Sequence, residues 1–338
     1  MLSPTRVRAL RRCLRAWYRH HGRDLPWRHT RDPYAILVSE FMLQQTQVAT
    51  VRSYYYYKEW LKRFPSFAAL ARASESEVLH GWQGLGYYAR ARNLHATARL
   101  VQDRYRGRFP RDLAAMRALP GIGKYTAHAV ATFAFGHSVP IVEANTARVL
   151  ARLFDLQSPI DSTRGGQLLW HHAAELMPKR HAPDFNSALV DLGALVCLPR
   201  KPKCPVCPVK RFCRATAPDS LPIRRGRPRT KRLLENHALV LNRDRILLEQ
   251  TDRRWRGMWI LPPLKLDRFN RSSSRPPVYR TVFPFTHHRI TLQVFRRRPR
   301  AAADQSQRWF GIDQLDSIPV PSPHRRAFRS LLAGNVEG

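Results

Sequence analysis

The sequence predicts a multidomain protein, with an all-α domain over residues 1–217 and a smaller α+β domain over residues 233–335. Two observations support this prediction. Apolar residues recur every three to four positions from about Asp32 to Phe212, which is the spacing of helices that bury one face. In the later part of the chain, apolar residues form short runs separated by turn residues, and this pattern is typical of strands.

The two patterns meet in a segment that we interpret as an interdomain linker, residues 218–232. It reads PDSLPIRRGRPRTKR, is rich in proline and arginine, and has no apolar period. At the start of the chain we expect a helix rather than a signal peptide, because no continuous hydrophobic stretch is present. The apolar face of that helix is expected to consist of Val7, Leu10, Leu14 and Trp17.

The charge of the chain indicates a polyanionic partner. Its 338 residues include 59 lysines and arginines against 24 aspartates and glutamates, a formal net charge of +35. The simplest partner for such an excess is nucleic acid. No apolar run reaches the roughly 18 residues of a membrane-spanning helix, so we expect no membrane partner. Five cysteines are too few and too clustered for a disulfide scaffold, and we therefore expect a reducing compartment.

Four of the cysteines form a cluster with the spacing C-x6-C-x2-C-x5-C. They are Cys197, Cys204, Cys207 and Cys213, in the segment CLPRKPKCPVCPVKRFC. The prolines between them indicate a loop, in which four thiolates can converge on one metal centre. The spacing alone leaves both zinc and an iron–sulfur cluster open. The fifth cysteine, Cys13, is expected to be a buried residue of the first helix.

The segment LPGIGKYTA, from Leu119 to Ala127, predicts two helices joined by a hairpin. Its glycines, Gly121 and Gly123, let the backbone approach a ligand closely. The helix that follows begins with free amide groups and the positive end of its dipole, an arrangement that binds phosphate without reading sequence. We therefore expect Gly121, Gly123 and Lys124 to contact nucleic acid.

Two carboxylates occur in apolar surroundings. Glu40 shares a predicted helix face with Ile36 and Leu37, so burial is expected to raise its pKa and keep it protonated near neutral pH. Glu143 follows an apolar stretch and precedes a helix, for which Asn145 is the better N-cap. From this stretch alone, Glu143 is either a charge that favours the helix N-terminus or a carboxylate that faces a developing positive charge.

The hairpin, the acidic residue beyond it and the cysteine spacing together resemble the helix–hairpin–helix DNA glycosylase superfamily with an iron–sulfur cluster. Three further segments closely resemble its MutY-type adenine glycosylases: LPWR (25–28), SEFMLQQTQVATV (39–51) and GLGYYARARNL (84–94). The resemblance implies a monomeric, monofunctional DNA glycosylase of the bacterial cytoplasm. Its implied substrate is adenine opposite 8-oxoguanine or guanine in double-stranded DNA, and its implied cofactor is a [4Fe–4S] cluster on the four cysteines.

The resemblance also implies catalytic roles. Glu40 matches the general acid that protonates adenine, which needs a proton before it can leave. Glu143 takes the place of the carboxylate that stabilises the oxocarbenium-like sugar, as in glycoside hydrolysis. Family members carry Asp-Gly where this chain has Glu143-Ala144, so the charge is kept on a side chain longer by one methylene. Tyr125 and Asn145 match residues that support the pocket.

DNA contacts follow from the same resemblance. Gln45 and Tyr88 match residues that enter the duplex when a base is flipped out, and Arg28 of the LPWR segment is a further expected contact. The C-terminal region resembles the Nudix-type domain with which such enzymes check for 8-oxoguanine. There, Thr286 and His287 match a Ser-His pair. The polar stretch LKLDRFNRSSSRPP stands where the family usually has a helix, so we expect a trimmed domain.

Two other functions remain as alternatives. A bifunctional glycosylase with lyase activity, like endonuclease III, needs an amine nucleophile. In that relative the lysine sits where this chain has Tyr125, and Lys124 is expected to point elsewhere on the helix. The second alternative is a DNA-binding protein without catalysis, for which the unusual Glu143 is the only support.

Overall fold

The computed structural model describes residues 2–53, 56–226, 230–264, 276–299, 301–302 and 305–333. The chain folds into two compact units. Unit 1 comprises Met1–Gln44 and Leu100–Gly226, and unit 2 comprises Gln45–Arg99 and Arg227–Gly338. The division differs from the predicted one, which placed 45–99 with the first domain.

Unit 1 is helical. Its α-helices are α1 (Pro4–His21), α2 (Pro33–Leu43), α8 (Leu113–Arg117), α9 (Lys124–Phe135), α10 (Ala144–Leu153), α11 (Thr163–Leu176) and α12 (Ala182–Leu195). Its short 3-10 helices are η1 (Pro26–Arg28), η2 (Cys204–Val206), η3 (Lys210–Phe212) and η4 (Pro218–Ser220). A further helix, α7 (Ala89–Tyr105), runs through the boundary between the two units.

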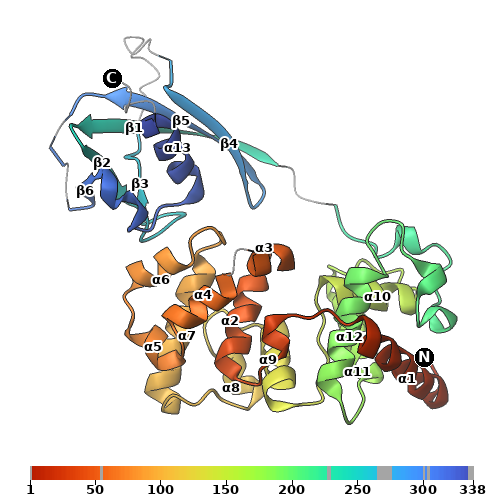
Figure 1. The fold of residues 1–338 in the computed structure, drawn as a ribbon. Coiled ribbons are helices and arrows are strands. Elements are labelled where there is room, and N and C mark those ends of the chain that lie inside the picture. The colour runs from red at the N-terminus through yellow and green to blue at the C-terminus, as the bar shows by residue number, and fades with distance from the viewer. Residues whose placement is uncertain are drawn as a thin grey trace. The chain divides into compact units, whose positions relative to one another are not determined.

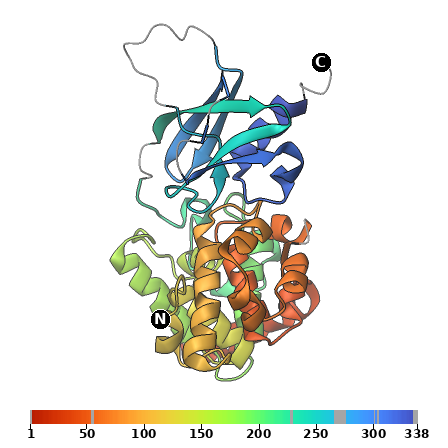
Figure 2. The same cartoon turned by 90° about the vertical axis from the view of Figure 1, so that its left-hand side faces the viewer.

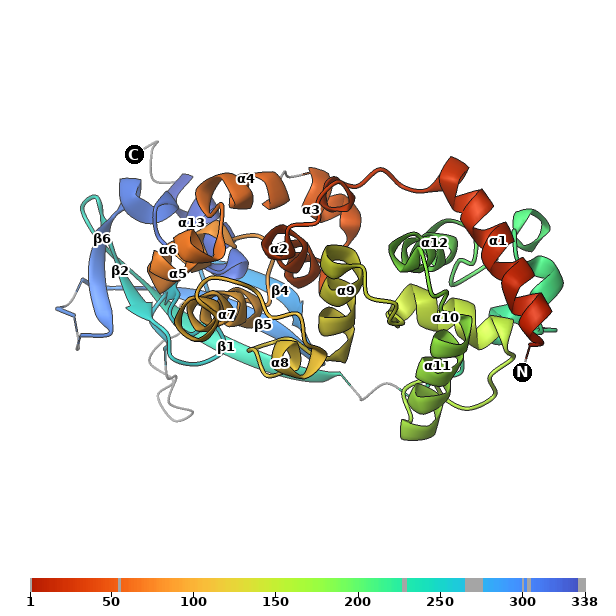
Figure 3. The same cartoon turned by 90° about the horizontal axis from the view of Figure 1, so that it is seen from below.

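Four helices of unit 1, α1, α10, α11 and α12, pack around one hydrophobic core (Figure 3). From α1, Leu10 and Leu14 are fully buried, and Val7 and Trp17 pack beside them at partial burial, which confirms the predicted apolar face. Cys13 is only partly buried, not buried as expected. The same core receives apolar residues from the other three helices, among them Val149, Leu150, Leu169, Leu189 and Leu192.

Helix α2 is the most apolar helix of unit 1 and packs against α9. The carboxylate of Asp32 caps its N-terminus by accepting the backbone N–H groups of Tyr34 and Ala35. Nine of its eleven residues are buried, because apolar residues cover nearly its whole circumference. The pairing of α2 with α9 places Glu40 and Tyr125 in one buried region of unit 1.

Unit 2 combines helices with a mixed sheet, which confirms the predicted α+β character of the C-terminal region (Figure 1). Its remaining helices are α3 (Val48–Ser53), α4 (Tyr56–Arg63), α5 (Phe67–Arg72), α6 (Glu75–Gly81), η5 (Ile312–Asp316) and α13 (Ser322–Ala333). Its strands are β1 (Lys231–Asn242), β2 (Arg245–Gln250), β3 (Trp259–Ile260), β4 (Tyr279–Phe285), β5 (His288–Arg297) and β6 (Gln307–Gly311).

The sheet has the strand order β3-β2-β1-β5-β4, with β6 paired to β2. Strands β1 and β5 are parallel, and β4 and β5 form an antiparallel hairpin. Helix α13 packs against β4 (Figure 2). Strand β1 begins inside the predicted linker, of which 227–229 lie outside the described residues, as do 265–275 of the polar stretch expected to replace a helix. Among the described helices, none is long and apolar enough to cross a membrane.

Candidate active site

Glu40 is a buried carboxyl group in unit 1. Its side chain lies on α2 among apolar residues, and the residue is 5% exposed. Burial raises the pKa of Glu40 to about 7, with a further contribution from the charge of Glu143 and against the lowering effect of a hydrogen bond with Tyr125. Within the described part of the chain, no group hydrogen-bonds its Oε2 atom. The site therefore contains an acid that can hold and release a proton near neutral pH.

Tyr125, in the first turn of α9, is the hydrogen-bond partner of that acid. Burial, followed by the charge of Glu40, keeps the pKa of Tyr125 well above its ordinary value. The phenol therefore stays neutral and can donate a hydrogen bond to the Glu40 carboxylate. Glu40, Tyr125 and Glu143 act on one another electrostatically, so the structure brings together three of the four predicted catalytic residues.

Glu143 is the N-cap residue of α10. Its Oε2 accepts the backbone N–H of Asn145 at 2.8 Å, and its Oε1 accepts the backbone N–H of Thr146 at 2.8 Å. The expectation that Asn145 caps this helix is wrong, because the longer Glu143 side chain reaches both free amides. The same contacts hold a negative charge at the positive end of α10. The Glu143 carboxylate can therefore cap α10 and also act electrostatically on Glu40 and Tyr125.

Asn145 has a different partner. Its Oδ1 accepts a hydrogen bond from Nη2 of Arg148 at 2.8 Å, and the same guanidinium donates to the carbonyls of Gly193 and Cys197, each at 2.7 Å. A Cβ atom on residue 193 would lie 2.7 Å from Cβ of Asn145, so α12 can approach α10 only because Gly193 is a glycine. Arg148 links the pocket to Cys197, the first cysteine of the cysteine loop.

Sequence reasoning missed Arg148 and its neighbour Arg152. They are 7% and 1% exposed, on an α10 face that is otherwise apolar. Arginine is rarely this buried without several partners, so two arginines four positions apart in ARVLARL were the available signal. Arg152 donates to the carbonyl of Leu198 at 2.6 Å and to Sγ of Cys197 at 3.3 Å, which fixes the start of the cysteine loop.

The four cysteines converge in the loop that follows α12. Burial and the neighbouring thiols of Cys197, Cys213 and Cys204 together raise the pKa of Cys207 to about 11. Thiolates on one tetrahedral zinc ion are about 3.8 Å apart, from a zinc–sulfur bond of about 2.3 Å. Among the described residues, the sole trio of metal-ligand atoms lying within 4.8 Å of one another contains no cysteine. Four thiols in one loop suit either a zinc ion or an iron–sulfur cluster, so the donor set fits both kinds of centre.

The hairpin between α8 and α9 has the expected form. Gly121 has φ 73°, a left-handed conformation that favours glycine, and Gly123 is the N-cap of α9. Both glycines are exposed, and no described atom would lie within 4 Å of a Cβ on Gly123. The ammonium of Lys124 lies 3.9 Å from the centroid of the Trp170 ring. The backbone of this turn is accessible to a ligand, and Lys124 lies against Trp170.

Of the expected DNA-entering residues, Gln45 is exposed and Tyr88 is not. Gln45 has φ 57°, a strained conformation for a residue other than glycine. Tyr88 is 5% exposed, whereas the preceding Tyr87 is 42% exposed with φ 46°. Because its ring is exposed, Tyr87 is a further candidate beside Tyr88. Arg90 holds this loop by donating to the carbonyls of Leu85 and Gly86.

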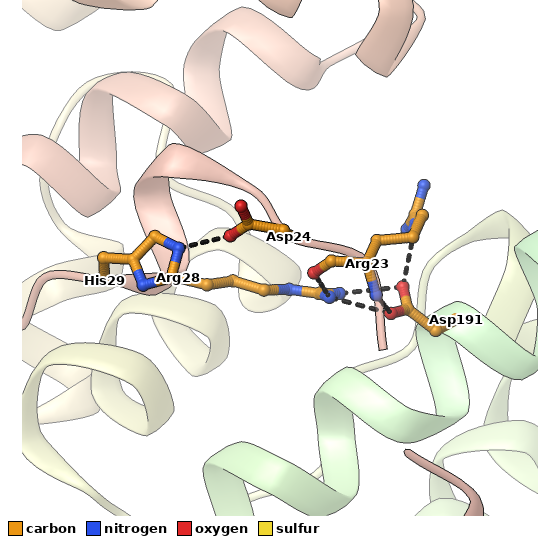
Figure 4. A network of polar contacts seen from close by, with 5 residues as sticks. All are labelled: Arg23, Asp24, Arg28, His29 and Asp191. Atoms are coloured by element: carbon orange, nitrogen blue, oxygen red, sulfur yellow. Dashed lines mark hydrogen bonds and ion pairs between the residues drawn. The ribbon is translucent and has the colours of Figure 1, made fainter. Parts of the chain in front are cut away.

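Arg28 is committed to a buried ion pair instead of a DNA contact (Figure 4). Its Nη1 and Nη2 donate to Oδ2 and Oδ1 of Asp191 at 2.7 and 2.8 Å, and Arg23 donates to the same carboxylate. The Asp191 side chain is fully buried, and hydrogen bonds from Arg28 lower its pKa despite burial. Releasing Arg28 to bind phosphate would weaken the pairing of that buried charge, so we assign it a structural role.

In unit 2, Thr286 and His287 form the two-residue turn between β4 and β5. Both are exposed, and Thr286 has φ 52°, which is unfavourable for a β-branched residue. Phe285, the last residue of β4, lies beneath the guanidinium of Arg254, 4.9 Å from it. The turn therefore presents a hydroxyl and an imidazole to solvent on a well-anchored hairpin.

Comparisons with known proteins identify relatives of this chain. Residues 38–167 match the model of the HhH-GPD superfamily of base excision DNA repair proteins. The chain is 44% identical over 218 residues to the human adenine DNA glycosylase, covering 62% of this chain and 40% of that protein. It is 44% identical over 202 residues to the adenine DNA glycosylase of Mycolicibacterium smegmatis, covering 60% of this chain and 67% of the relative.

A solved thermostable thymine-DNA glycosylase is also similar, with a TM-score of 0.57 and 35% identity over 62% of this chain and 95% of that one. The matching part of the chain spans about 40% of the human relative and two thirds of the mycobacterial one. The buried acid, the hairpin and the cysteine loop lie within unit 1, and the HhH-GPD match over residues 38–167 includes parts of both units. The chain belongs to the adenine DNA glycosylase family of the HhH-GPD superfamily.

Proposed function

We propose that the protein is a monofunctional adenine DNA glycosylase that hydrolyses the N-glycosidic bond of adenine opposite 8-oxoguanine or guanine in duplex DNA. The observation that carries this proposal is the Glu40 carboxyl, which is buried, has a pKa of about 7 and has one oxygen without a partner among the described residues. An acid in this state can protonate a base that enters the pocket, and the protonated base leaves more easily.

The other residues of the pocket support the remaining steps. As adenine departs, positive charge develops on the sugar, and the Glu143 carboxylate, held by two amides of α10, stabilises that charge. The neutral phenol of Tyr125 orients Glu40 and stabilises its conjugate base after proton transfer. Asn145 orders the start of α10 through Arg148. After the base has left, water attacks the sugar and gives its proton to the Glu40 carboxylate, and the DNA strand stays intact.

The position of Lys124 favours this mechanism over the lyase alternative. A lyase forms a Schiff base between an amine and the sugar. The side chain that contacts Glu40 is Tyr125, whereas the Lys124 ammonium lies against the Trp170 ring. An amine held by a cation–π contact is not directed at the buried acid. We therefore propose hydrolysis without β-elimination.

For DNA binding, we propose that the hairpin residues Gly121, Gly123 and Lys124 contact phosphate. The open backbone of the turn and the N-terminus of α9 support this role. We further propose that Gln45 and Tyr87 enter the duplex as adenine is flipped out, because both are exposed. Side chains that occupy the vacated stack offset part of the cost of flipping, which is a few kcal/mol.

We propose that Cys197, Cys204, Cys207 and Cys213 hold a [4Fe–4S] cluster. The resemblance of the C-x6-C-x2-C-x5-C spacing to that of the iron–sulfur DNA glycosylases supports a cluster over one zinc ion. Bound there, the cluster would anchor the loop that carries Lys210 and Arg211. Iron and sulfide analysis of anaerobically purified protein, with its visible absorption, tests this assignment. A colourless protein with one zinc on these cysteines would overturn it.

We propose that the C-terminal domain, 233–335 beyond a linker at 218–232, is Nudix-like and reads 8-oxoguanine through Thr286 and His287. The exposed hairpin turn that carries them supports this role. Thr286→Ala and His287→Ala should reduce the preference for adenine opposite 8-oxoguanine over adenine opposite guanine. Unchanged discrimination in both variants would remove the turn from the recognition surface. We propose that the enzyme acts as a monomer.

The central test is single-turnover excision from a duplex with adenine opposite 8-oxoguanine. Glu40→Gln keeps the shape of the side chain but cannot donate the proton, so excision should fall by roughly 10² or more while DNA binding persists. Glu59→Gln is the matched control, because this exposed carboxylate on α4 pairs only with Lys62 in the described structure. Wild-type excision by Glu40→Gln would refute the role, and strand nicking by the wild type would indicate the lyase.

A further inference from the structure

A second group of metal-ligand side chains lies on α11, away from the cysteines in sequence. Nδ1 of His172 is 2.8 Å from Oε2 of Glu175, and Nε2 of His171 is 3.4 Å from Oε1 of the same carboxylate. The spacing of three and four residues places these side chains on one helix face. The three donor atoms lie within 4.8 Å of one another, and no other such trio occurs among the described histidines, cysteines, aspartates and glutamates.

Neighbouring groups hold the His172 ring and the backbone that carries Glu175. The His172 ring stacks on Phe154, with centroids 4.0 Å apart and an interplanar angle of 8°. The guanidinium of Arg11 donates to the backbone carbonyls of Glu175, Leu176 and Met177, which fixes the end of α11. The side chains of His172 and Glu175 are 13% and 25% exposed. Little conformational freedom would therefore be lost when they bind an ion.

The donor set selects the class of cation. Two imidazole nitrogens and one carboxylate oxygen suit zinc and neighbouring late first-row metals, whereas magnesium and calcium prefer oxygen ligands. Zinc–nitrogen and zinc–oxygen bonds of about 2.0–2.2 Å place tetrahedral ligands about 3.4 Å apart. The imidazole nitrogens lie 2.8 Å from Oε2 and 3.4 Å from Oε1 of Glu175, so each is near this separation from one oxygen of the carboxylate. The side chain of His171 is 58% exposed, so a fourth position remains open to water.

We propose that His171, His172 and Glu175 form a binding site for Zn²⁺ or a similar late first-row divalent cation. The site is separate from the cysteine loop, and the proposed excision reaction uses none of its residues. The ion takes the place of the hydrogen bond between Nδ1 of His172 and Oε2 of Glu175. It ties the last turns of α11 together next to Phe154, and so orders a surface segment of unit 1.

Equilibrium dialysis of the tag-free full chain against buffered Zn²⁺ tests the proposal, with zinc and iron measured on the same sample. The wild type should take up one zinc per chain while its iron content stays constant. Glu175→Gln and His171→Asn should each weaken zinc binding by at least about tenfold, because each removes one ligand. Circular dichroism of these surface variants verifies that they remain folded.

His21→Gln is the matched control, since His21 is an exposed histidine next to His20 on α1 but belongs to no such trio. Its zinc affinity should equal that of the wild type. Two results would overturn the proposal. One is a wild-type chain that binds no zinc at constant iron content. The other is equal zinc binding by the wild type, Glu175→Gln and His171→Asn, which would assign the metal to another site.

Discussion

Replacing Glu143 by glutamine separates its two roles, in stability and in catalysis. Glutamine keeps one acceptor oxygen and replaces the other by an NH₂ group, which cannot accept a hydrogen bond. One of the two amides that Glu143 now binds at 2.8 Å therefore loses its partner. Loss of a whole N-cap costs ~0.5–2 kcal/mol, so we expect a loss near 1 kcal/mol. In a chain of this size that lowers the melting temperature by about 2–4 °C.

The effect on excision should be much larger. A preorganised group that faces developing charge in a buried site contributes roughly 10²–10³ in rate, or about 2.7–4 kcal/mol. A helix-end charge alone would contribute only about 0.3–1 kcal/mol, and only to stability. Glu143→Gln should therefore lose most single-turnover excision while it unfolds only slightly earlier than the wild type. Because the mispair is still bound, the loss should appear in the rate at saturating protein.

Glu143→Asp is the matched control for this experiment. Aspartate keeps the charge, is a better N-cap than glutamate and restores the residue that is usual in the family. It should melt at or above the wild-type temperature and retain substantial excision, although Ala144 in place of glycine limits the gain. Single-turnover adenine release and thermal melting are measured on all three proteins. If Glu143→Gln excises as fast as the wild type, the carboxylate is only a helix cap and the mechanism is refuted.

Three further predictions concern other residues. Burial raises the pKa of Glu40 from 4.5 to about 7, so the unfolded chain loses this proton at a lower pH than the folded protein does. As pH rises through that range, the free energy of unfolding of the wild type therefore falls by up to about 3 kcal/mol. Glu40→Gln should therefore melt above the wild type at pH 8, by a margin that shrinks at pH 5.5; a margin independent of pH would contradict the burial argument. Arg28→Ala should destabilise the protein by about 3 kcal/mol, because Asp191 keeps only Arg23, while the salt dependence of DNA binding stays unchanged; a smaller salt slope would restore Arg28 as a phosphate contact. Tyr87→Ala should slow single-turnover excision by about tenfold or more through lost stacking, and Tyr87→Phe, which keeps the ring, should stay within about twofold; an unchanged rate for Tyr87→Ala would return the wedge role to Tyr88.

Periodicity and local chemistry in the sequence determined the helices, the change to strands and the main candidate site. Leu10 and Leu14 are buried as their spacing predicts, because helix packing depends on which face is apolar. The raised pKa of Glu40 was predictable for the same reason, since a carboxyl on an apolar face loses its hydration. Gly121 has the left-handed conformation that its place in the hairpin indicated.

Contacts between residues far apart in sequence could be decided only by the tertiary structure. The partner of Arg28 is Asp191, more than 160 positions away, and this pairing turned an expected DNA contact into a structural ion pair. Tyr87 is exposed and Tyr88 is buried because Tyr87 adopts a left-handed backbone conformation. The sequence, in which both residues are tyrosine, does not indicate this difference.

The N-cap of α10 shows the same limit at short range. Local preference favoured Asn145, but the Arg148 guanidinium, held by carbonyls of a later helix and loop, engages the Asn145 side chain, while Glu143 reaches the free amides. The sequence determined which groups were present at this helix end. The packing of α12 against α10, made possible by the missing side chain of Gly193, decided which of them binds which partner, because hydrogen-bond partners depend on position in space.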